Sequence, residues 1–325
     1  MTQTSVEVAR DMAERQTRRG ESLTRRSIRR LLRRRLATVC LVVIALFYAV
    51  GAFAPLIAPS GYAHQNLDAT FEGPSLSHPL GTDRLGRDTL SRNIFAARTT
   101  TIVTVATVAT GFVLLPVVLG MLAGYVGGWV DSTVNRTGEI LASLPGLPML
   151  VLVNATMRPR FVKWVGDFGG VIRWQGITDS GFADYFLIFG VLSLFGWVGG
   201  MRLIRSQVLT LRGSEFILAA RASGASTPRI LFQHLLPNVM PLVIVGASSA
   251  LGGIALSEIG LTFLGVGIQP PHPSFGALIT DGAPRTVLEN HPELLIVPAT
   301  IVASLIFAFN LLGDALNDVL TSRAN

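Results

Sequence analysis

Few of the residues that could carry out chemistry stand at the spacing that a reaction requires. The single lysine, Lys163, follows no glycine-rich loop, so the chain lacks the G-x-x-x-x-G-K-S/T motif that holds nucleotide phosphates. Gly265 and Gly267 are followed by Pro270, where a dinucleotide-binding motif needs its last glycine. The sequence contains neither an HExxH zinc motif nor a GxSxG nucleophile motif. We therefore expect no catalytic residue, no metal site and no cofactor on this chain, which is not itself an enzyme.

One carboxylate stands inside an otherwise apolar run. Glu258 lies in the segment GGIALSEIGLTFLG (252–265), which is apolar enough to be part of a membrane span. A carboxylate at membrane depth is expensive, so Glu258 is a candidate for lining a pathway or gate. The alternative is a structural glutamate, either satisfied by a neighbouring helix or exposed to water at the end of the span.

A second group of charges precedes the second apolar run, in the segment HPLGTDRLGRDTLSR (78–92). Asp83 and Arg87 are four residues apart, as are Asp88 and Arg92, and such pairs meet on one face of a helix. We interpret this cluster as a structural lock of the segment rather than a substrate contact, because paired charges usually satisfy one another.

The elements that must position these residues are membrane spans. Of the 325 residues, 50% are hydrophobic and only 14% are charged, against roughly 25% charge in soluble domains. The run 36–58 is long enough to cross a bilayer as a helix. Five further runs qualify, at 99–124, 138–157, 185–206, 239–264 and 294–313. The sequence predicts an all-α integral membrane protein with about six transmembrane helices.

The arginines predict the orientation. Eleven of them lie in residues 1–35, whose net charge of +7 equals that of the whole chain. Basic segments stay on the cytoplasmic side, so we expect both termini and the 206–238 loop in the cytoplasm of a cell (inner or plasma) membrane protein. This tail is expected to bind anionic membrane lipids and no nucleic acid. The extracytoplasmic parts are then 59–98, 158–184 and 265–293, the last two within a core domain at 99–320.

Small residues mark one helix face. Gly120, Gly124 and Gly128 form a GxxxGxxxG row at the end of the second span. Such rows let membrane helices approach closely. We expect this row to pack against another helix of the same chain, with a subunit interface as the alternative.

The loop 206–238 is too polar to span and is predicted to form two short helices. Ser214 can cap a helix that Gly224 ends, and Thr227 can cap a second one with Pro228 in its first turn. Pro237 and Pro241 are expected to end that second helix near Leu236. A plain surface loop and a DNA-binding helix-turn-helix are alternatives, but a loop held between spans cannot settle into a DNA groove. We favour a knob that docks into a cytoplasmic partner.

The residues of this loop carry a resemblance to a known family. The pattern E-F-x-x-A-A-R-A-x-G-A-S-x-x-R-I-x-x-x-H-x-L-P-N (215–238) resembles the EAA coupling loop of ABC importer permeases. The segments 78–92, GYVGGWVD (124–131), 257–276 and FNLLGDALNDVL (309–320) are also similar to the dipeptide/oligopeptide/nickel permease family, in particular to its second, C-type subunit. The resemblance implies a type I ABC importer permease fold, and it assigns contact with the ATPase to Glu215, Phe216, Ala219, Ala220, Arg221, Gly224, Ala225, Ser226, Pro228 and Pro237.

The same resemblance implies partners and a function. Peptides delivered by an extracytoplasmic substrate-binding protein would pass between this chain and a homologous second permease. Two cytoplasmic ABC ATPase subunits would bind ATP and Mg and drive the cycle. Two features depart from the family pattern: Leu218 replaces the usual glutamate, and 158–184 reads as an insertion that could lie on the outer membrane surface as an amphipathic segment.

Two alternatives to a peptide permease are compatible with the sequence. Nickel chelates or glutathione-like peptides are transported on the same scaffold in the family that the chain resembles. An autonomous secondary transporter is a different class, which often shows internal repeats and several intramembrane charges. We find no clear repeat and only Glu258 as a candidate charge, which disfavours that class.

Overall fold

The computed structural model describes residues 35–171 and 181–321. Apolar sequence in long runs without strand-like alternation favours helices, and helices make up nearly all regular structure in the described ranges. The long helices are α3 (Arg35–Ala52), α5 (Thr89–Thr107), α6 (Leu115–Val126), α7 (Gly128–Ser143), α8 (Gly146–Val171), α9 (Phe182–Leu211), α12 (Leu236–Phe263) and α15 (Glu293–Thr321). The predicted N-terminal tail lies almost entirely outside the described residues.

Short elements connect the long helices. They are α4 (Ala54–Ile57), η1 (Leu67–Ala69), α10 (Glu215–Ala222), α11 (Thr227–Arg229), α13 (Phe275–Gly282) and α14 (Arg285–Asn290). Two π-helical segments, η2 (Val108–Leu114) and η3 (Ile230–Leu235), join α5 to α6 and α11 to α12. The continuous helices that result run over 89–126 and 227–263.

Five helices in the described residues are long and apolar enough to cross a membrane. The predicted third span differs from the others, because α7 and α8 meet at a bend of 96°. Leu144, at the bend, is extended and precedes Pro145, and the residue before a proline is pushed out of the helical conformation. The pair counts as a sixth crossing only if the two helices are taken together.

The second span begins earlier than its apolar run. Asp88 caps α5 by accepting a hydrogen bond of 2.7 Å from the backbone nitrogen of Ser91. Helix α5 therefore begins at Thr89, within the segment 59–98 that was predicted to lie outside the membrane. Capping is a polar signal, and hydropathy alone does not detect it.

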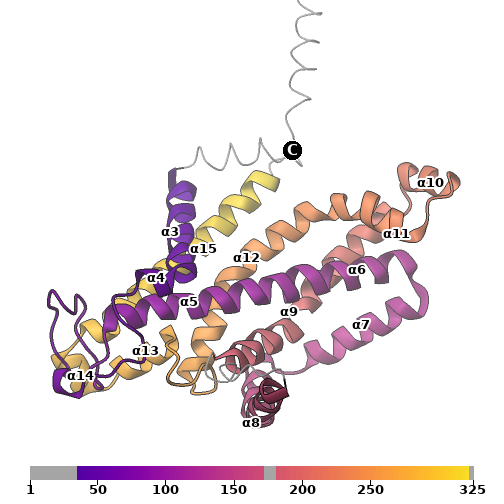
Figure 1. Ribbon diagram of the computed structural model, residues 1–325. Coiled ribbons are helices and arrows are strands. Elements are labelled where there is room, and N and C mark those ends of the chain that lie inside the picture. Colours follow the sequence, from indigo (N-terminus) through magenta and orange to yellow (C-terminus); the bar gives the residue numbers. More distant parts are fainter. Residues whose placement is uncertain (1–34, 172–180, 322–325) are drawn as a thin grey trace, which may run out of the picture.

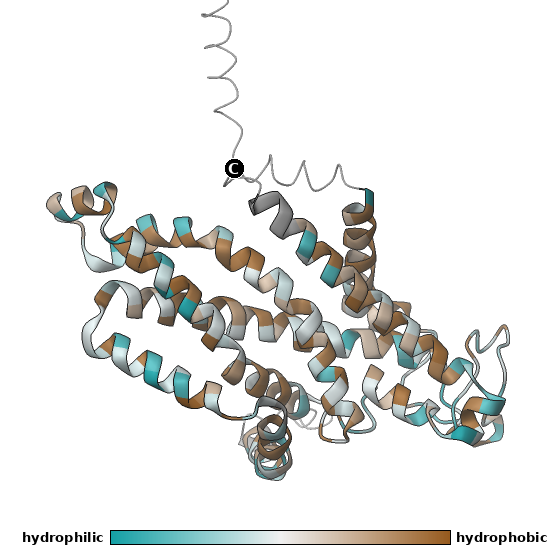
Figure 2. Cartoon of the chain, turned by 180° about the vertical axis from the view of Figure 1, so that it is seen from behind, coloured by the Kyte–Doolittle hydropathy of each residue, from teal (hydrophilic) through white to brown (hydrophobic). Residues whose placement is uncertain are grey.

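The two ends of the molecule carry different elements (Figure 1). One end, hereafter the α10 end, carries α10 and α11. The opposite end, hereafter the α14 end, carries α13, α14 and the segment 59–88. Figure 2 shows that hydrophobic residues make up much of the long helices. Many of their large apolar side chains are exposed, for example Leu46 and Phe307 at 63% and 64%. Apolar side chains that face outward along helices of this length indicate contact with lipid.

Candidate functional site

A helical loop leaves the body of the protein between α9 and α12. α10 is followed by Gly224, whose φ is +79°. This left-handed conformation suits glycine, since a side chain there would clash with the backbone. α11 begins after Ser226 and leads through η3 into α12. The loop therefore returns to the body as one continuous helix.

The inner side of α10 is anchored to the ends of three long helices. Ile217 is fully buried in a cluster with residues of α6, α9, η3 and α12, namely Val117, Met121, Ile204, Val208, Ile230, Leu231, Leu235, Val239 and Val243. Arg221 adds a polar anchor, because its Nε donates a hydrogen bond of 3.1 Å to the Tyr125 hydroxyl and its guanidinium carbon lies 4.9 Å from the centre of that ring. α10 is thus tied to the cluster in which residues of α6, α9 and α12 also pack.

The outer side of α10 is apolar and exposed. Phe216 and Leu218 are 42% and 52% exposed, Ala219 is exposed and Ala220 is half-buried. Glu215, in the first turn of the helix, is exposed as well. Leu218, which stands where the family pattern has glutamate, therefore extends the apolar surface. A surface of this kind suits docking into a partner.

The other loop residues that were predicted to contact the ATPase pack near α10 or lie at the starts of α11 and α12. Ala225 is half-buried against the cluster that holds Ile217. Ser226 is the N-cap residue of α11, Pro228 lies in its first turn, and Pro237 is exposed on α12. Thr227 is thus the first helical residue, and the prediction that it caps the helix is wrong.

Two other local predictions also differ from the structure. Ser214 is the N-cap residue of α10, as predicted, but its hydroxyl donates to the Leu211 carbonyl at 2.6 Å and makes no capping hydrogen bond to the helix. The second helix does not end near Leu236 but continues to Phe263. The π-helical turn of η3 ends at Leu235, two residues before Pro237, and its wider hydrogen-bond pattern tolerates the donor that proline lacks.

The glycine row packs within the chain. A Cβ on Gly124 would lie 2.9 Å from the Arg205 carbonyl oxygen and the Val208 side chain, and one on Gly120 would crowd Met201 and Ile204 equally. α6 therefore approaches α9 at backbone distance. Gly128 does not belong to this face, since it follows the end of α6 and a Cβ there would have no atom of the described chain within 4 Å.

Glu258 is fully buried between α5 and α12. Its Oε2 accepts a hydrogen bond of 2.9 Å from the Thr100 hydroxyl of α5, and Thr262 lies one turn further along α12 with its hydroxyl 3.5 Å from Oε1. This placement fits the alternative of a glutamate satisfied by a neighbouring helix. A pathway or gate role for Glu258 stays a prediction.

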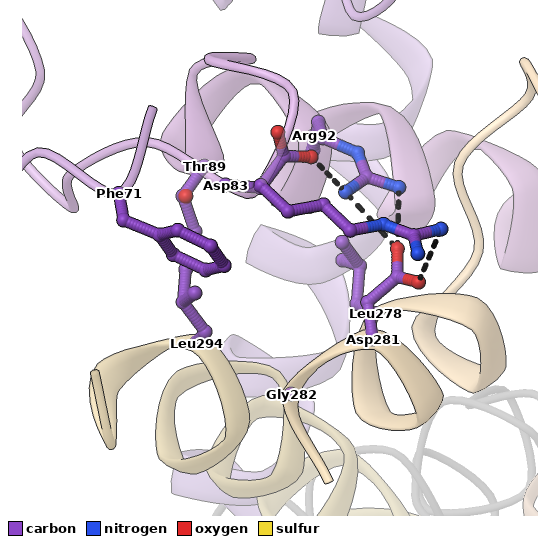
Figure 3. Close-up of a pocket in the computed structure, with 9 residues that line it drawn as sticks. Phe71, Asp83, Thr89, Arg92, Leu278, Asp281, Gly282 and Leu294 are labelled. Carbon is purple, nitrogen blue, oxygen red and sulfur yellow. Dashed lines mark hydrogen bonds and ion pairs between the residues drawn. The ribbon is translucent and has the colours of Figure 1, made fainter. Parts of the chain in front are cut away.

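The charge cluster at the α14 end is a buried network (Figure 3). Asp83 accepts from the Nε of Arg87 at 2.7 Å and from Arg92 at 2.5 Å, and all three side chains are nearly inaccessible. Asp281 of α13 binds the other side of Arg92 at 3.3 Å and lies 3.6 Å from Arg84. The network therefore joins the segment before α5 to α13.

The predicted pairing of this cluster is correct for one pair and wrong for the other. Asp83 and Arg87 do pair, although they lie in the turn before α5. Asp88 instead caps α5 and lies 3.1 Å from His78, because its position at the helix start places its carboxylate over free backbone nitrogens. Arg92 instead pairs with Asp83 and Asp281. No local pattern in the sequence indicates the pair with Asp281.

The environment of Asp83 keeps its carboxyl ionised. Burial raises the pKa of Asp83, but the charge of Arg92, hydrogen bonds from the backbone of Arg87 and Leu85, and the charge of Arg87 together lower it below its ordinary value. The carboxylate is therefore a fixed negative charge between two cations.

Two more ion pairs were not predicted. Arg205 of α9 binds Asp131 of α7 through two nitrogens, both at 2.5 Å. Arg158 of α8 binds Asp184 of α9 at 2.7 and 3.3 Å, and Asp184 also accepts from the backbone of Gln269. Residues 158–171, the first part of the predicted insertion 158–184, belong to α8. Its placement on a membrane surface stays a prediction.

Comparisons with known proteins place these features in a family context. Residues 116–325 match the family described as "Binding-protein-dependent transport system inner membrane component", and residues 22–74 match "N-terminal TM domain of oligopeptide transport permease C". The chain is 34% identical over 302 residues to the dipeptide transport system permease protein DppC of Bacillus subtilis, which covers 93% of this chain and 86% of that protein. It is also 34% identical over 320 residues to the oligopeptide transport system permease protein OppC of Haemophilus influenzae, with 98% and 94% covered. The glutathione transport system permease protein GsiD of Pectobacterium atrosepticum is 32% identical over 298 residues, with 91% and 89% covered.

Proposed function

The chain belongs to the family of binding-protein-dependent transport system inner membrane components, and on this basis we propose that it forms half of a pathway that imports peptides. It is a multi-pass permease subunit of an ABC importer and not a catalytic enzyme. Relatives named as dipeptide and oligopeptide permeases, similar over most of their length, support peptides as the substrate. We further propose that a second, homologous permease completes the pathway and that a binding protein delivers the peptide.

The observation that carries this proposal is the construction of the 206–238 loop. Its outer side offers Phe216, Leu218 and Ala219, while its inner side is fixed to α6, α9 and α12 through Ile217 and Arg221. A partner that grips the outer side can therefore move three membrane helices together. We propose that two cytoplasmic ATPase subunits, which bind ATP and Mg, use this loop to convert their closure into opening of the pathway on the opposite side.

Peptide uptake in cells tests the proposal. A strain that lacks this chain should fail to accumulate a radiolabelled dipeptide or tripeptide, and the wild-type chain should restore uptake. A chain in which Phe216, Leu218 and Ala219 are replaced by aspartate should reach the membrane but restore no uptake. Normal uptake by that variant would contradict the role of the loop.

A second experiment separates this proposal from an autonomous carrier. The purified chain alone in liposomes should move no peptide, whereas liposomes that contain the complete complex should do so when ATP is enclosed with the ATPases. Gradient-driven uptake by the lone chain would overturn the proposal.

Glutathione is a second candidate substrate, because the chain is 32% identical to a permease named for glutathione transport. Competition with uptake of the labelled peptide distinguishes general peptides from glutathione as the substrate class. If unlabelled dipeptides and tripeptides reduce uptake while glutathione does not, the general peptide assignment holds, and the reverse pattern favours glutathione.

A further inference from the structure

A groove lies between α5 and α9 near the α14 end, at the opposite end of the molecule from the 206–238 loop. It has a volume of about 450 Å³, within the range of sites for small organic ligands. Its walls are mostly aromatic and come from α5, α9 and two connecting segments. The lining residues used below are Arg98, Ile102, Ala106, Tyr185, Phe186 and Phe189.

The polar groups of the groove gather at one of its ends. α5 runs away from the α14 end, so its lining residues lie progressively deeper in the order Arg98, Ile102 and Ala106. From the first to the last of these, the helix rises by about 12 Å along its axis. α9 runs in the same direction, and its lining residues change from Tyr185 to Phe189. Both walls therefore place their polar groups near the mouth, which Phe95 and Phe182 also line, whereas the lining residues at the deep end are all apolar.

Arg98 supplies the charge at the mouth. Its side chain is half-buried, and no ion pair or hydrogen bond joins it to another residue of the described ranges. The polar groups around it are the hydroxyls of Tyr62 and Tyr185 and the ring of His272, with no carboxylate among the described residues of the lining. An arginine placed in this way can bind an anion.

The aromatic wall is held in place from behind. Phe186 stacks on Phe161 of α8 with ring centres 5.1 Å apart and meets Phe189 edge to face at 5.0 Å. α8 itself is fixed to α9 by the pair of Arg158 with Asp184. The groove is thus a formed site and not a gap between independent helices.

We propose that this groove binds one phospholipid from the membrane leaflet on the side of the α14 end. The phosphate would bind Arg98, and an acyl chain would lie along Ile102, Ala106 and Phe189. A peptide suits the deep end poorly, because its backbone groups would be buried among apolar side chains without hydrogen-bond partners. An acyl chain has no such groups, and the length and polarity of the groove match an anionic amphiphile.

Lipid retention in the assembled complex tests the inference. The complex is reconstituted in vesicles of phosphatidylethanolamine and phosphatidylglycerol, extracted into detergent and examined by native mass spectrometry. The wild type should keep one phospholipid that Ala106→Trp loses. Arg98→Gln should retain it about tenfold less, the effect of one lost charge-assisted hydrogen bond. Val105→Trp is the matched control, since Val105 neighbours Ala106 but is 53% exposed and does not line the groove.

Three results would overturn the proposal, and none depends on a transport assay. The first is equal phospholipid retention by wild type and Ala106→Trp when both complexes are intact. The second is displacement of the retained lipid by a short peptide, which would make the groove a peptide site. The third is a cross-link from Phe186→Cys to another protein chain, which would show that a subunit covers the groove.

Discussion

Asp83 is the residue on which two buried guanidinium groups converge. Removing one partner of a buried ion pair leaves the other charge uncompensated, which typically costs about 3–5 kcal/mol. We predict that Asp83→Asn lowers the free energy of unfolding by about 3 kcal/mol, the lower end of this range, because Asp281 remains as a partner of Arg87 and Arg92. Detergent-based unfolding of the purified complex measures the change. Glu289→Gln is the control, because its pair with Arg285 is exposed and is worth about 0–1 kcal/mol.

The same carboxyl predicts a pH dependence. The folded protein holds the pKa of Asp83 below its ordinary value of 3.8, so the unfolded chain takes up the proton first as the pH falls. The stability that Asp83 contributes is therefore complete above about pH 5 and is lost as the pH falls through the folded-state pKa. We expect the stability difference between wild type and Asp83→Asn to shrink over this acidic range. A difference that stays constant or grows there would contradict the assignment.

Single residues also show what the sequence can and cannot predict at this scale. The Asp83–Arg87 pair follows from a spacing of four residues. Asp281 lies nearly two hundred residues further along the chain, so no local spacing relates it to Arg92. Glu258 was located correctly within a helix, but its partner Thr100 lies on another helix, and a single sequence does not reveal that contact.

At the scale of elements, Gly224 sets the angle between α10 and α11. A β-branched residue is strained at a φ of +79°, at a cost of about 1–3 kcal/mol, although no atom of the described chain lies within 4 Å of where its Cβ would be. We predict that Gly224→Val shifts α10, weakens association with the ATPases several-fold and reduces peptide uptake accordingly. Co-purification of the subunits measures the first effect. Gly213→Val, also in open space but without a positive φ, should behave as wild type.

The contact of α6 with α9 gives a second prediction for elements. Gly124 has the Arg205 carbonyl and Val208 at contact distance, so a larger side chain must separate the two helices. We expect Gly124→Leu to lower the stability of the complex by at least about 1–3 kcal/mol, the usual cost of overpacking. Thermal inactivation of the purified complex is the measurement. Gly199→Leu on α9 should be tolerated, because its position is exposed.

Helix positions were largely predictable, whereas helix ends were not. Hydropathy located the spans because each run is long and continuous. It missed the start of α5, which depends on Asp88 as a cap, and the passage of α12 through Pro237, which depends on a π-helical turn. Hydropathy also missed the break between α7 and α8, because the run 138–157 is apolar on both sides of Pro145 and hydropathy does not register the conformation that a proline imposes on the residue before it.

For the whole molecule, contacts at the α14 end decide how many times the chain crosses the membrane. Asp281 binds Arg92, and the Tyr62 hydroxyl lies 3.2 Å from Nδ1 of His272. The segments 59–88 and 264–292 must therefore share one side. They do so if α7 and α8 together make one crossing, which gives six in all. With only five crossings these two segments would lie on opposite faces.

Six crossings predict which residues can be labelled from which side. In a Cys40→Ser background, Gln65→Cys and Thr286→Cys should react with a membrane-impermeant maleimide on the same face, because both lie in exposed positions at the α14 end. Ser223→Cys, exposed beyond α10, should react only from the opposite face. If the arginine-rich tail lies in the cytoplasm, as basic segments usually do, intact cells should expose only the first two positions. Labelling of Gln65→Cys and Thr286→Cys from opposite faces would rule out six crossings, and with them the placement of the 206–238 loop on the side of the ATPases.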